Sequence, residues 1–220
     1  DRLAFYSYAH VPWIKGNGQR GFNDEDIPKD AAKRELYETG KELLYKNDYH
    51  EIGMDHFALT TDSLFESFEI GKLHRNFMGY SSSKTQLMIG LGVSSISDSW
   101  HSFAQNVKSI EEYYQLLDAN TIPVFRGHLL TEEDLIIRRH ILNLMCQFET
   151  SWAESKYYFK EIPEVMVQLK EMEKDGLIHF IPNGIQVTGE GKPFVRNICM
   201  AFDLLLKRKA PDTALFSMTV

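Results

Sequence analysis

The stretch 52–106 gathers side chains that can bind or orient a ligand. It contains the imidazoles of His56 and His74, the guanidinium of Arg75, an amide and small hydroxyl groups, interspersed with apolar residues and glycines. A buried polar group without a partner costs about 1–3 kcal/mol, so a segment shaped only by packing would not hold so many of them. Glycines allow a backbone to approach a ligand closely. The composition therefore predicts that this stretch forms the wall of a binding site.

A carboxylate is the natural partner for two of these side chains. Arg75 can hold a carboxylate through two parallel hydrogen bonds, and we expect His74 to act beside it. The alternative is a surface loop in which both residues take part in a local ion pair. His56 comes at the end of a predicted strand, a position at which barrel enzymes place functional residues. A structural histidine bonded to a backbone carbonyl is the alternative there.

Two further arginines, Arg126 and Arg196, are candidates to face the same ligand. Arg196 lies near the start of a predicted helix, where an arginine more often pairs with a neighbouring acid. A metal site built from the histidines would need a carboxylate or thiolate in matched geometry, and we expect no metal ligands in this chain. Cys146 and Cys199 lie far apart in predicted helices, which favours packed thiols over a disulfide or a zinc site.

Composition and charge narrow the class of protein. With 43% hydrophobic and 25% charged residues, the 220-residue chain has the composition of a globular protein with a sizeable core. A net charge of −7 argues against nucleic acid as a partner, because such binders cluster Lys and Arg. The sequence has no apolar run of the roughly 20 residues that a membrane span needs and no signal-peptide pattern, so we expect a cytoplasmic protein without membrane contact.

The first 60 residues have the pattern of an α/β unit. Residues 3–9 are apolar on both alternating faces, which predicts a buried strand of a parallel sheet. A glycine-containing loop over 13–26, a helix from 28 to 47 and a strand over 49–59 follow, which indicates a strand–helix–strand repeat with a crossover. A buried parallel strand needs neighbours on both sides, so its position at residue 3 suggests a piece of a longer protein.

The rest of the chain shows capping and turn signals. Ser109 with Glu112, and Thr131 with Asp134, mark two helix starts. Asn183-Gly184 is a hairpin turn signal. The remaining predictions are a helix over 64–70, a loop over 72–83, a strand or a close backbone approach over 88–96, helices over 131–147, 155–160, 163–175 and 193–209, and strands over 177–181 and 185–188. Three helices followed by a hairpin resemble a winged helix, although the acidic helix before the hairpin is a poor surface for phosphates.

Several motifs, in order along nearly the whole chain, resemble the oxygen-independent coproporphyrinogen III oxidases. They are Tyr8-Ala9-His10-Val11-Pro12, Gly53-Met54-Asp55-His56-Phe57-Ala58, Leu73-His74-Arg75-Asn76-Phe77, Gly79-Tyr80, Gly92-Val93-Ser94-Ser95-Ile96-Ser97, Ala104-Gln105-Asn106 and Val195-Arg196-Asn197-Ile198-Cys199-Met200. The resemblance implies a radical S-adenosylmethionine enzyme of haem synthesis, which decarboxylates two propionates of its substrate oxidatively and gives protoporphyrinogen IX. It further implies a monomer that needs an electron donor.

The resemblance also implies where the cofactors bind. This family holds a [4Fe–4S] cluster on a loop with three cysteines, and this sequence has no such triplet. We therefore expect the chain to correspond to the C-terminal half of the enzyme and to be inactive alone. The family's contacts to S-adenosylmethionine fall on Ala9 and Ile96, and Tyr6 is placed in the same pocket. The substrate-binding candidates are those described above: His74, Arg75, His56, Arg126 and Arg196.

The expected architecture has two parts. Residues 1–130 would supply the last part of a partial α/β barrel with an attached segment, and residues 131–220 a mainly helical, winged-helix-like domain. In this interpretation the chain closes the barrel over S-adenosylmethionine and a tetrapyrrole substrate. The alternative is a non-catalytic module that binds a tetrapyrrole or a protein partner.

Overall fold

The computed structural model describes residues 1–8, 10, 19, 21 and 23–209. Helices and strands are interspersed along the chain, and the strand pairs among these residues all run antiparallel. The strands form sheets of order β1-β3-β2, β4-β5, β6-β7-β8-β9 and β10-β12-β11. The mixed α/β class predicted from the sequence is confirmed. Among the described residues, no helix combines the length and apolar character required to cross a membrane.

The first sheet differs from the predicted parallel unit. Strand β1 (Arg2–Ala4) ends before the predicted limit, and residue 9 lies outside the described residues. Phe5 leaves the sheet and stacks on Tyr37 of α1 (Asp30–Lys46), with ring centroids 5.6 Å apart. Of the predicted loop over 13–26, the described part contains a short 3₁₀ helix, η1 (Asp24–Asp26). The predicted buried strand is therefore short and partly exposed, because its aromatic residue packs on the helix.

The predicted strand over 49–59 is a hairpin. It consists of β2 (Tyr49–Gly53) and β3 (His56–Leu59), joined through Met54, whose φ of +49° reverses the chain. Strand β3 lies between β1 and β2 and runs antiparallel to both. Strands β1 and β2 therefore run parallel to each other, and α1 connects them in the sequence. The predicted crossover is thus present, but β3 lies between the two parallel strands. Helix α2 (Ser63–Glu69) follows as predicted.

The middle of the chain forms two further hairpin structures. The predicted loop over 72–83 contains β4 (His74–Asn76) and β5 (Gly79–Ser81). Of the two alternatives for residues 88–96 the strand is wrong, since most of the segment is irregular and Ser94 has a φ of +60°. The close backbone approach is present at Gly90, where a Cβ atom would lie 2.7 Å from the backbone oxygen of Ile96. The second sheet consists of β6 (Leu87–Met88), β7 (Ile96–Ser99), β8 (Ser102–Asn106) and β9 (Val124–Leu129), with α3 (Ile110–Asp118) between the last two.

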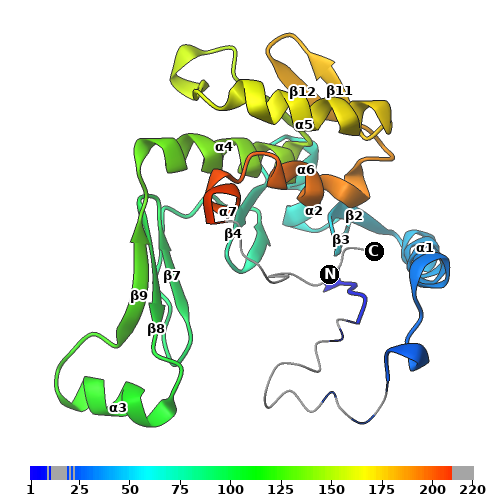
Figure 1. Ribbon diagram of the computed structural model, residues 1–220. Helices are drawn as coiled ribbons and strands as arrows, with labels where there is room; N and C mark the ends of the chain where they lie inside the picture. The colour runs from blue at the N-terminus through cyan, green and yellow to red at the C-terminus, as the bar shows by residue number, and fades with distance from the viewer. Residues whose placement is uncertain (9, 11–18, 20, 22, 210–220) are drawn as a thin grey trace.

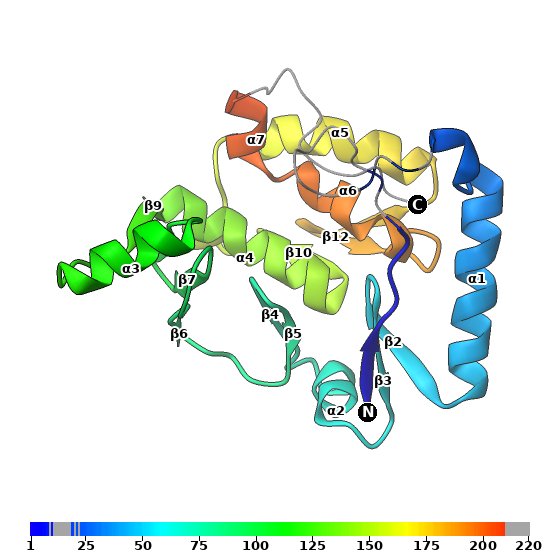
Figure 2. The same ribbon diagram turned by 90° about the horizontal axis from the view of Figure 1, so that it is seen from below.

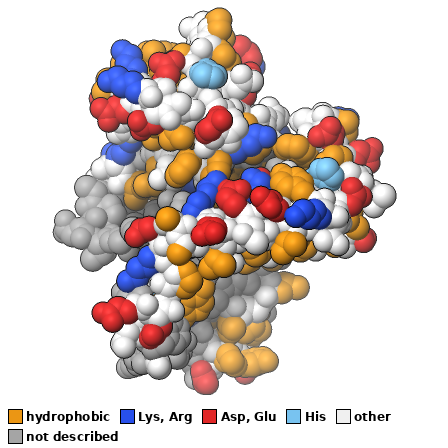
Figure 3. Space-filling model, turned by 90° about the vertical axis from the view of Figure 1, so that its right-hand side faces the viewer, with side chains coloured by type: hydrophobic (Ala, Val, Ile, Leu, Met, Phe, Trp, Pro, Cys, Tyr) orange, Lys and Arg blue, Asp and Glu red, His pale blue; other side chains and the backbone are white. Residues whose placement is uncertain are grey.

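The four-stranded sheet of β6, β7, β8 and β9 projects from the body of the molecule. In Figure 1, β7, β8 and β9 extend away from α4 as an arm that carries α3 at its far end. Figure 2 shows α3 and α1 at opposite ends of the molecule. On the face next to α1, acidic, basic and hydrophobic side chains are intermixed (Figure 3), without one large region of a single charge. The arm is joined to the body of the molecule at the end next to α4.

The C-terminal part follows most of the sequence signals. Thr131 caps α4 (Glu132–Gln147) in the predicted box with Asp134, and Asn183, with a φ of +53°, turns the predicted hairpin. The other elements are β10 (Glu149–Ser151), η2 (Ser155–Tyr157), α5 (Ile162–Lys174), β11 (Ile178–Ile181), β12 (Gly184–Val187), η3 (Lys192–Phe194), α6 (Val195–Met200) and α7 (Leu204–Lys209). The last helix was predicted as one segment over 193–209, but it is interrupted before α7.

The core joins both parts of the chain. Ile52, Leu64 and Tyr80 belong to one buried cluster with residues of α4, α5 and α6, such as Leu144 and Val165. The Tyr80 hydroxyl donates a 2.8 Å hydrogen bond to the backbone carbonyl of Met145, which ties the β4–β5 hairpin to α4. The partial barrel, the winged helix and the boundary at residue 130 stay predictions.

Candidate functional site

One cleft in the described part of the chain is lined by α4, by strands of the arm and by the C-terminal helices. Its volume is about 1000 Å³, which is at the upper end of the range for small-molecule sites. We call it the main cleft. Its walls come from β4, β7, β8, β9, α4, α6 and α7, and its apolar lining includes Met54, Phe77, Ile96, Phe103, Ile141 and Met145. These apolar surfaces suit a large ligand with a flat hydrophobic body.

Arg75 is the best-placed cation of the main cleft. It lies in β4, paired with Tyr80 of β5, and its guanidinium carbon sits 4.7 Å from the centroid of the Tyr80 ring. Its Nη1 atom is buried and makes no hydrogen bond. A buried donor without a partner is costly, and a bound carboxylate would relieve that cost. The predicted role of Arg75 therefore agrees with its surroundings.

His56 belongs to an aromatic series that leads to Arg75. Its ring lies edge-to-face with Tyr6 on one side, at 6.4 Å between centroids, and with Tyr80 on the other, at 5.2 Å. Its buried Nδ1 atom makes no hydrogen bond, so the alternative of a histidine held through that atom by a backbone carbonyl is not realised. Burial, followed by the charge of Arg75, lowers the pKa of His56. A neutral imidazole can accept a hydrogen bond from a polar ligand.

Acidic and basic side chains both occur near Arg75. Burial and the nearby Glu51 raise the pKa of Asp55, whereas the charges of Arg75 and Arg196 act in the opposite direction. Arg196 comes from the start of α6 and lines the main cleft with Arg75. Asn197, next to Arg196, has a buried Oδ1 without a hydrogen-bond partner. Buried atoms of His56, Arg75 and Asn197 thus make no hydrogen bond, and of these three residues Arg75 lines the main cleft.

Arg126 reaches the main cleft from the arm. It lies on β9, opposite Gln105 of β8, and its Nε donates a 2.8 Å hydrogen bond to the Gln105 side-chain oxygen. This neutral partner leaves the positive charge of Arg126 uncompensated. Its side chain also lies near the ring of Phe125, at 5.3 Å from the centroid. Arg126 is therefore held at the cleft with its charge available.

The wall between the arm and α4 rests on a buried ion pair. Nη2 of Arg138 donates hydrogen bonds of 2.9 and 3.2 Å to the two oxygens of Asp98, and its Nη1 reaches the carbonyl of Ser99 at 3.1 Å. The guanidinium also lies 5.1 Å from the Trp100 ring centroid and 5.0 Å from that of Phe103. The acid of Asp98 is thereby neutralised, and it does not repel an anionic ligand.

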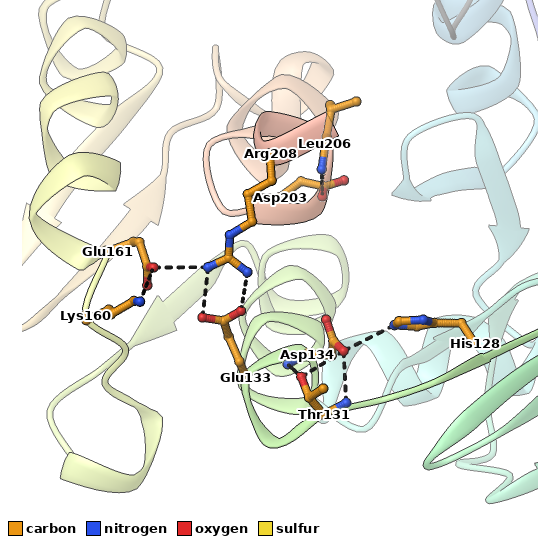
Figure 4. A network of polar contacts seen from close by, with 9 residues as sticks. All are labelled: His128, Thr131, Glu133, Asp134, Lys160, Glu161, Asp203, Leu206 and Arg208. Atoms are coloured by element: carbon orange, nitrogen blue, oxygen red, sulfur yellow. Dashed lines mark hydrogen bonds and ion pairs between the residues drawn. The ribbon is translucent and has the colours of Figure 1, made fainter. Parts of the chain in front are cut away.

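The acids at the mouth of the main cleft are likewise compensated (Figure 4). Arg208 of α7 donates two hydrogen bonds to Glu133 and one of 3.0 Å to Glu161. Burial acts to raise the pKa of Asp134, but hydrogen bonds from Thr131 and His128 hold it below its ordinary value. The carboxylates of Glu133 and Asp134 are thus engaged with partners among the described residues.

His74 is not in the main cleft, although the sequence suggested that it acts with Arg75. Successive residues of a strand point to opposite faces, so His74 is directed away from its neighbour. It is buried, 6% exposed, in a second cleft of about 700 Å³ on the other side of β4. Burial, followed by the charges of Lys84 and Arg138, lowers its pKa. The predicted His74–Arg75 pair is therefore wrong as a single site.

The residues predicted to contact S-adenosylmethionine are only partly described. Ile96 lines the main cleft, Tyr6 contacts His56 but neither of these two is among the residues that line the cleft, and Ala9 is outside the described residues. Together with the open polar atoms of His56 and Arg75, these positions fit a ligand with both apolar and polar parts. A metal centre is different, because no group of three potential ligands is found among the described residues.

The two cysteines do not resemble ligands of an iron–sulfur cluster. Both are buried and free, and burial raises the pKa of Cys146 and of Cys199 to about 12. Metal binding requires the thiolate, which this environment disfavours. The described residues therefore do not fit a [4Fe–4S] cluster.

Several residues of the site were missed at the level of sequence. Asp98, Gln105, Arg138 and Arg208 all border the main cleft. The arginine pair in α4 was a possible signal, because charged residues inside an apolar helical pattern suggest a buried partner. Asp98, the partner of Arg138, is 40 residues away in the sequence, and no local pattern indicates the pairing.

The comparisons with known proteins agree with this arrangement. No family model matches the chain. It is 38% identical over 215 residues to the oxygen-independent coproporphyrinogen III oxidase of Escherichia coli, covering 96% of this chain and 47% of that protein. The enzyme of the same name from Helicobacter pylori is 34% identical over 212 residues, with coverages of 94% and 46%.

A solved structure gives the same result for the fold. The coproporphyrinogen III oxidase of Escherichia coli, described as a radical SAM enzyme, matches with a TM-score of 0.85 and 37% identity, over 94% of this chain and 48% of that one. The fold is thus that of part of a radical SAM enzyme. More narrowly, the chain is a homologue of the oxygen-independent coproporphyrinogen III oxidases, which confirms the resemblance. It spans about half the length of the curated relatives that it matches.

Proposed function

We propose that the chain forms part of an oxygen-independent coproporphyrinogen III oxidase of haem biosynthesis. In this proposal the main cleft holds coproporphyrinogen III while two of its propionates are decarboxylated oxidatively to vinyl groups, which gives protoporphyrinogen IX. Support comes from the sequence and fold similarity to enzymes of that name. The observation that carries the proposal at the level of residues is the unpartnered, buried Nη1 of Arg75 in a cleft of suitable size.

The substrate chemistry matches the charges of the main cleft. A tetrapyrrole combines a broad apolar ring system with several carboxylates, and the cleft combines apolar walls with Arg75, Arg126 and Arg196. Arginine suits this task because its planar fork binds a carboxylate through two hydrogen bonds. The engaged acids Asp98 and Asp134 would not oppose binding. These arginines would fix the propionates in one orientation, which is a large part of what a protein contributes around a radical cofactor.

S-adenosylmethionine would be held by Ile96, Ala9 and Tyr6, with His56 beside them. The chemistry that it supplies when bound is abstraction of a hydrogen from the propionate side chain. His56, which is half-buried and lies against Tyr6 and Tyr80, would limit the access of water to this region. The iron–sulfur cluster and its electron donor would engage a part of the full-length protein other than this chain. We also propose that the enzyme is monomeric and cytoplasmic and that it binds neither nucleic acid nor membranes.

The test is an anaerobic assay of the full-length protein after reconstitution with iron and sulfide. Conversion of coproporphyrinogen III to a divinyl product should require S-adenosylmethionine. Arg75→Gln should lower kcat/KM by about 10–100-fold, the equivalent of losing a charge-assisted hydrogen bond of about 1.5–3 kcal/mol. Cluster content should not change. Arg34→Gln, which removes an exposed arginine paired with Glu38 on α1, is the matched control.

Two outcomes would contradict the proposal at different levels. Unaltered kinetics of Arg75→Gln would remove Arg75 from the substrate site while leaving the enzyme activity intact. A full-length protein that holds no cluster and converts no substrate would favour the alternative, a non-catalytic module that binds a tetrapyrrole or a partner protein.

A further inference from the structure

The second cleft is positively charged, in contrast to the chain as a whole. It is bounded by the β4–β5 hairpin, Trp100, α4 and η2, and we call it the basic cleft. Its lining contains four cations, Lys72, Lys84, Arg139 and Lys156, together with His74. No Asp or Glu is among the described residues that line it. Four cations without a carboxylate are a strong local excess in a protein whose net charge is −7.

Three of these cations lie against aromatic rings: Lys156, with its Nζ 4.6 Å from the Tyr157 centroid, and, without an ion pair among the described residues, Arg139 and Lys84. The guanidinium carbon of Arg139 lies 3.4 Å from the centroid of Tyr157, and its Nη1 donates a 3.1 Å hydrogen bond to the carbonyl of Ser151. Lys84 places its Nζ 4.5 Å from the Trp100 centroid. Neither contact neutralises charge. Both restrict the side chains to one position, so little conformational freedom would be lost when an anion binds.

The two other lysines differ from each other. Lys156 forms an exposed ion pair with Glu154, at 2.9 Å, so it contributes least. Among the described residues, Lys72 has no recorded ion-pair partner, and it stands at the rim two residues before the buried His74. Burial lowers the pKa of His74, and the charges of Lys84 and Arg138 act in the same direction, whereas Asp98 acts in the opposite one.

The shape of the cleft indicates a small ligand rather than a macromolecule. A volume of about 700 Å³ with a buried histidine at its floor suits a compact molecule. Asn143 and Gln147 of α4 add amide groups to the lining, and Leu142 adds apolar surface. We propose that the basic cleft binds a small organic polyanion, one that carries two or more phosphate or carboxylate groups between Lys72, Lys84 and Arg139. This site is separate from the main cleft and does not depend on the proposed enzyme activity.

Titration calorimetry on the full chain at low ionic strength tests the proposal, with inorganic tripolyphosphate and the tricarboxylate tricarballylate as probes. Saturable binding of either probe is the expected result, and the stronger one identifies the preferred anion. The double variant Lys72→Gln/Lys84→Gln should weaken binding by at least about tenfold, because it removes two charge-assisted contacts. Neither lysine has a recorded role in the fold beyond the exposed contact with Trp100.

Matched controls separate a defined site from diffuse attraction. Lys170→Gln/Lys174→Gln removes the same charge from α5, outside both clefts, and should leave the affinity within about twofold, since exposed charges at that distance are screened. Equal weakening by both double variants would overturn the proposal, as would the absence of binding by both probes. Loss of binding in Arg75→Gln with retention in the Lys72/Lys84 variant would place the anion in the main cleft and would also overturn it.

Discussion

The main cleft and the basic cleft share α4 and β4 as walls, yet they manage charge in different ways. In the main cleft, acids and bases occur together, and Asp98, Glu133 and Asp134 are each engaged by a basic partner. The basic cleft has cations and no lining acid among the described residues. The difference arises from neighbouring residues that diverge, since His74 and Arg75, like Arg138 and Arg139, line different clefts. Adjacency in sequence is thus a poor guide to a shared site in this protein.

The largest effect is expected from removing the ion pair between Arg138 and Asp98. Arg138→Met should cost about 3–5 kcal/mol of unfolding free energy, because it leaves Asp98 buried without its partner. The side chains of Arg138 and Asp98 are 14% and 7% exposed. Urea denaturation gives the free energy, and Arg34→Met, which removes an exposed arginine of α1, should change it far less. A small effect of Arg138→Met would show that the wall does not depend on this pair.

A second prediction concerns the anchor behind the basic cleft. His140 is fully buried; its Nδ1 lies 2.8 Å from the Thr150 hydroxyl and its Nε2 2.9 Å from the carbonyl of Tyr157, which lines the basic cleft. His140→Leu removes both hydrogen bonds and should destabilise the protein by about 1–3 kcal/mol. The substitution should also weaken tripolyphosphate binding, because the guanidinium of Arg139 packs on the ring of Tyr157. Unchanged binding would show that Tyr157 is positioned by other contacts.

The pH dependence of stability is a second test of the burial of His140. Burial lowers the pKa of His140 from its ordinary value of 6.5, so the unfolded chain binds a proton more readily than the folded one. The stabilisation is present above pH 6.5 and is lost as the pH falls through the folded-state pKa. Denaturation at pH 7.5 and 5.5 should therefore show a smaller loss in His140→Gln than in the parent chain. His179→Gln, at an exposed position of β11, should keep the parent's loss.

The smallest expected effect concerns the mouth of the main cleft. Arg208→Ala releases Glu133 and Glu161, which are then close together without their shared cation. We expect a modest fall in the melting temperature at low ionic strength that disappears near about 1 M salt, because the contacts are exposed and screened. The opposite dependence on salt would contradict the view that the acids at this mouth are neutralised by Arg208.

The parts of the fold that could be predicted are those whose signals are local. Thr131 with Asp134, Ser109 with Glu112, and Asn183-Gly184 each identify an element, because capping and turn chemistry act within a few residues. Strands β4, β5 and β10 have three residues each, too few for a period to emerge. Their formation depends on partners elsewhere in the chain.

The candidate site shows the same limit. Arg75, Arg126, Arg196 and Ile96 were predicted and do line the main cleft, because the family resemblance and the chemistry of carboxylate binding point to them. The role of Arg138 was not predicted, because it consists of an ion pair with Asp98, which is 40 residues away in the sequence. His74 was assigned to the wrong cleft, because the chain around it was taken for a loop and the alternation of a strand was not considered.

Leu142 borders both clefts from its position on α4. One side chain therefore contributes surface to both clefts. A larger or smaller residue there would change both linings at once. During evolution, the two clefts therefore cannot be reshaped independently at position 142, and a change that suits a ligand of one must be acceptable to the ligand of the other.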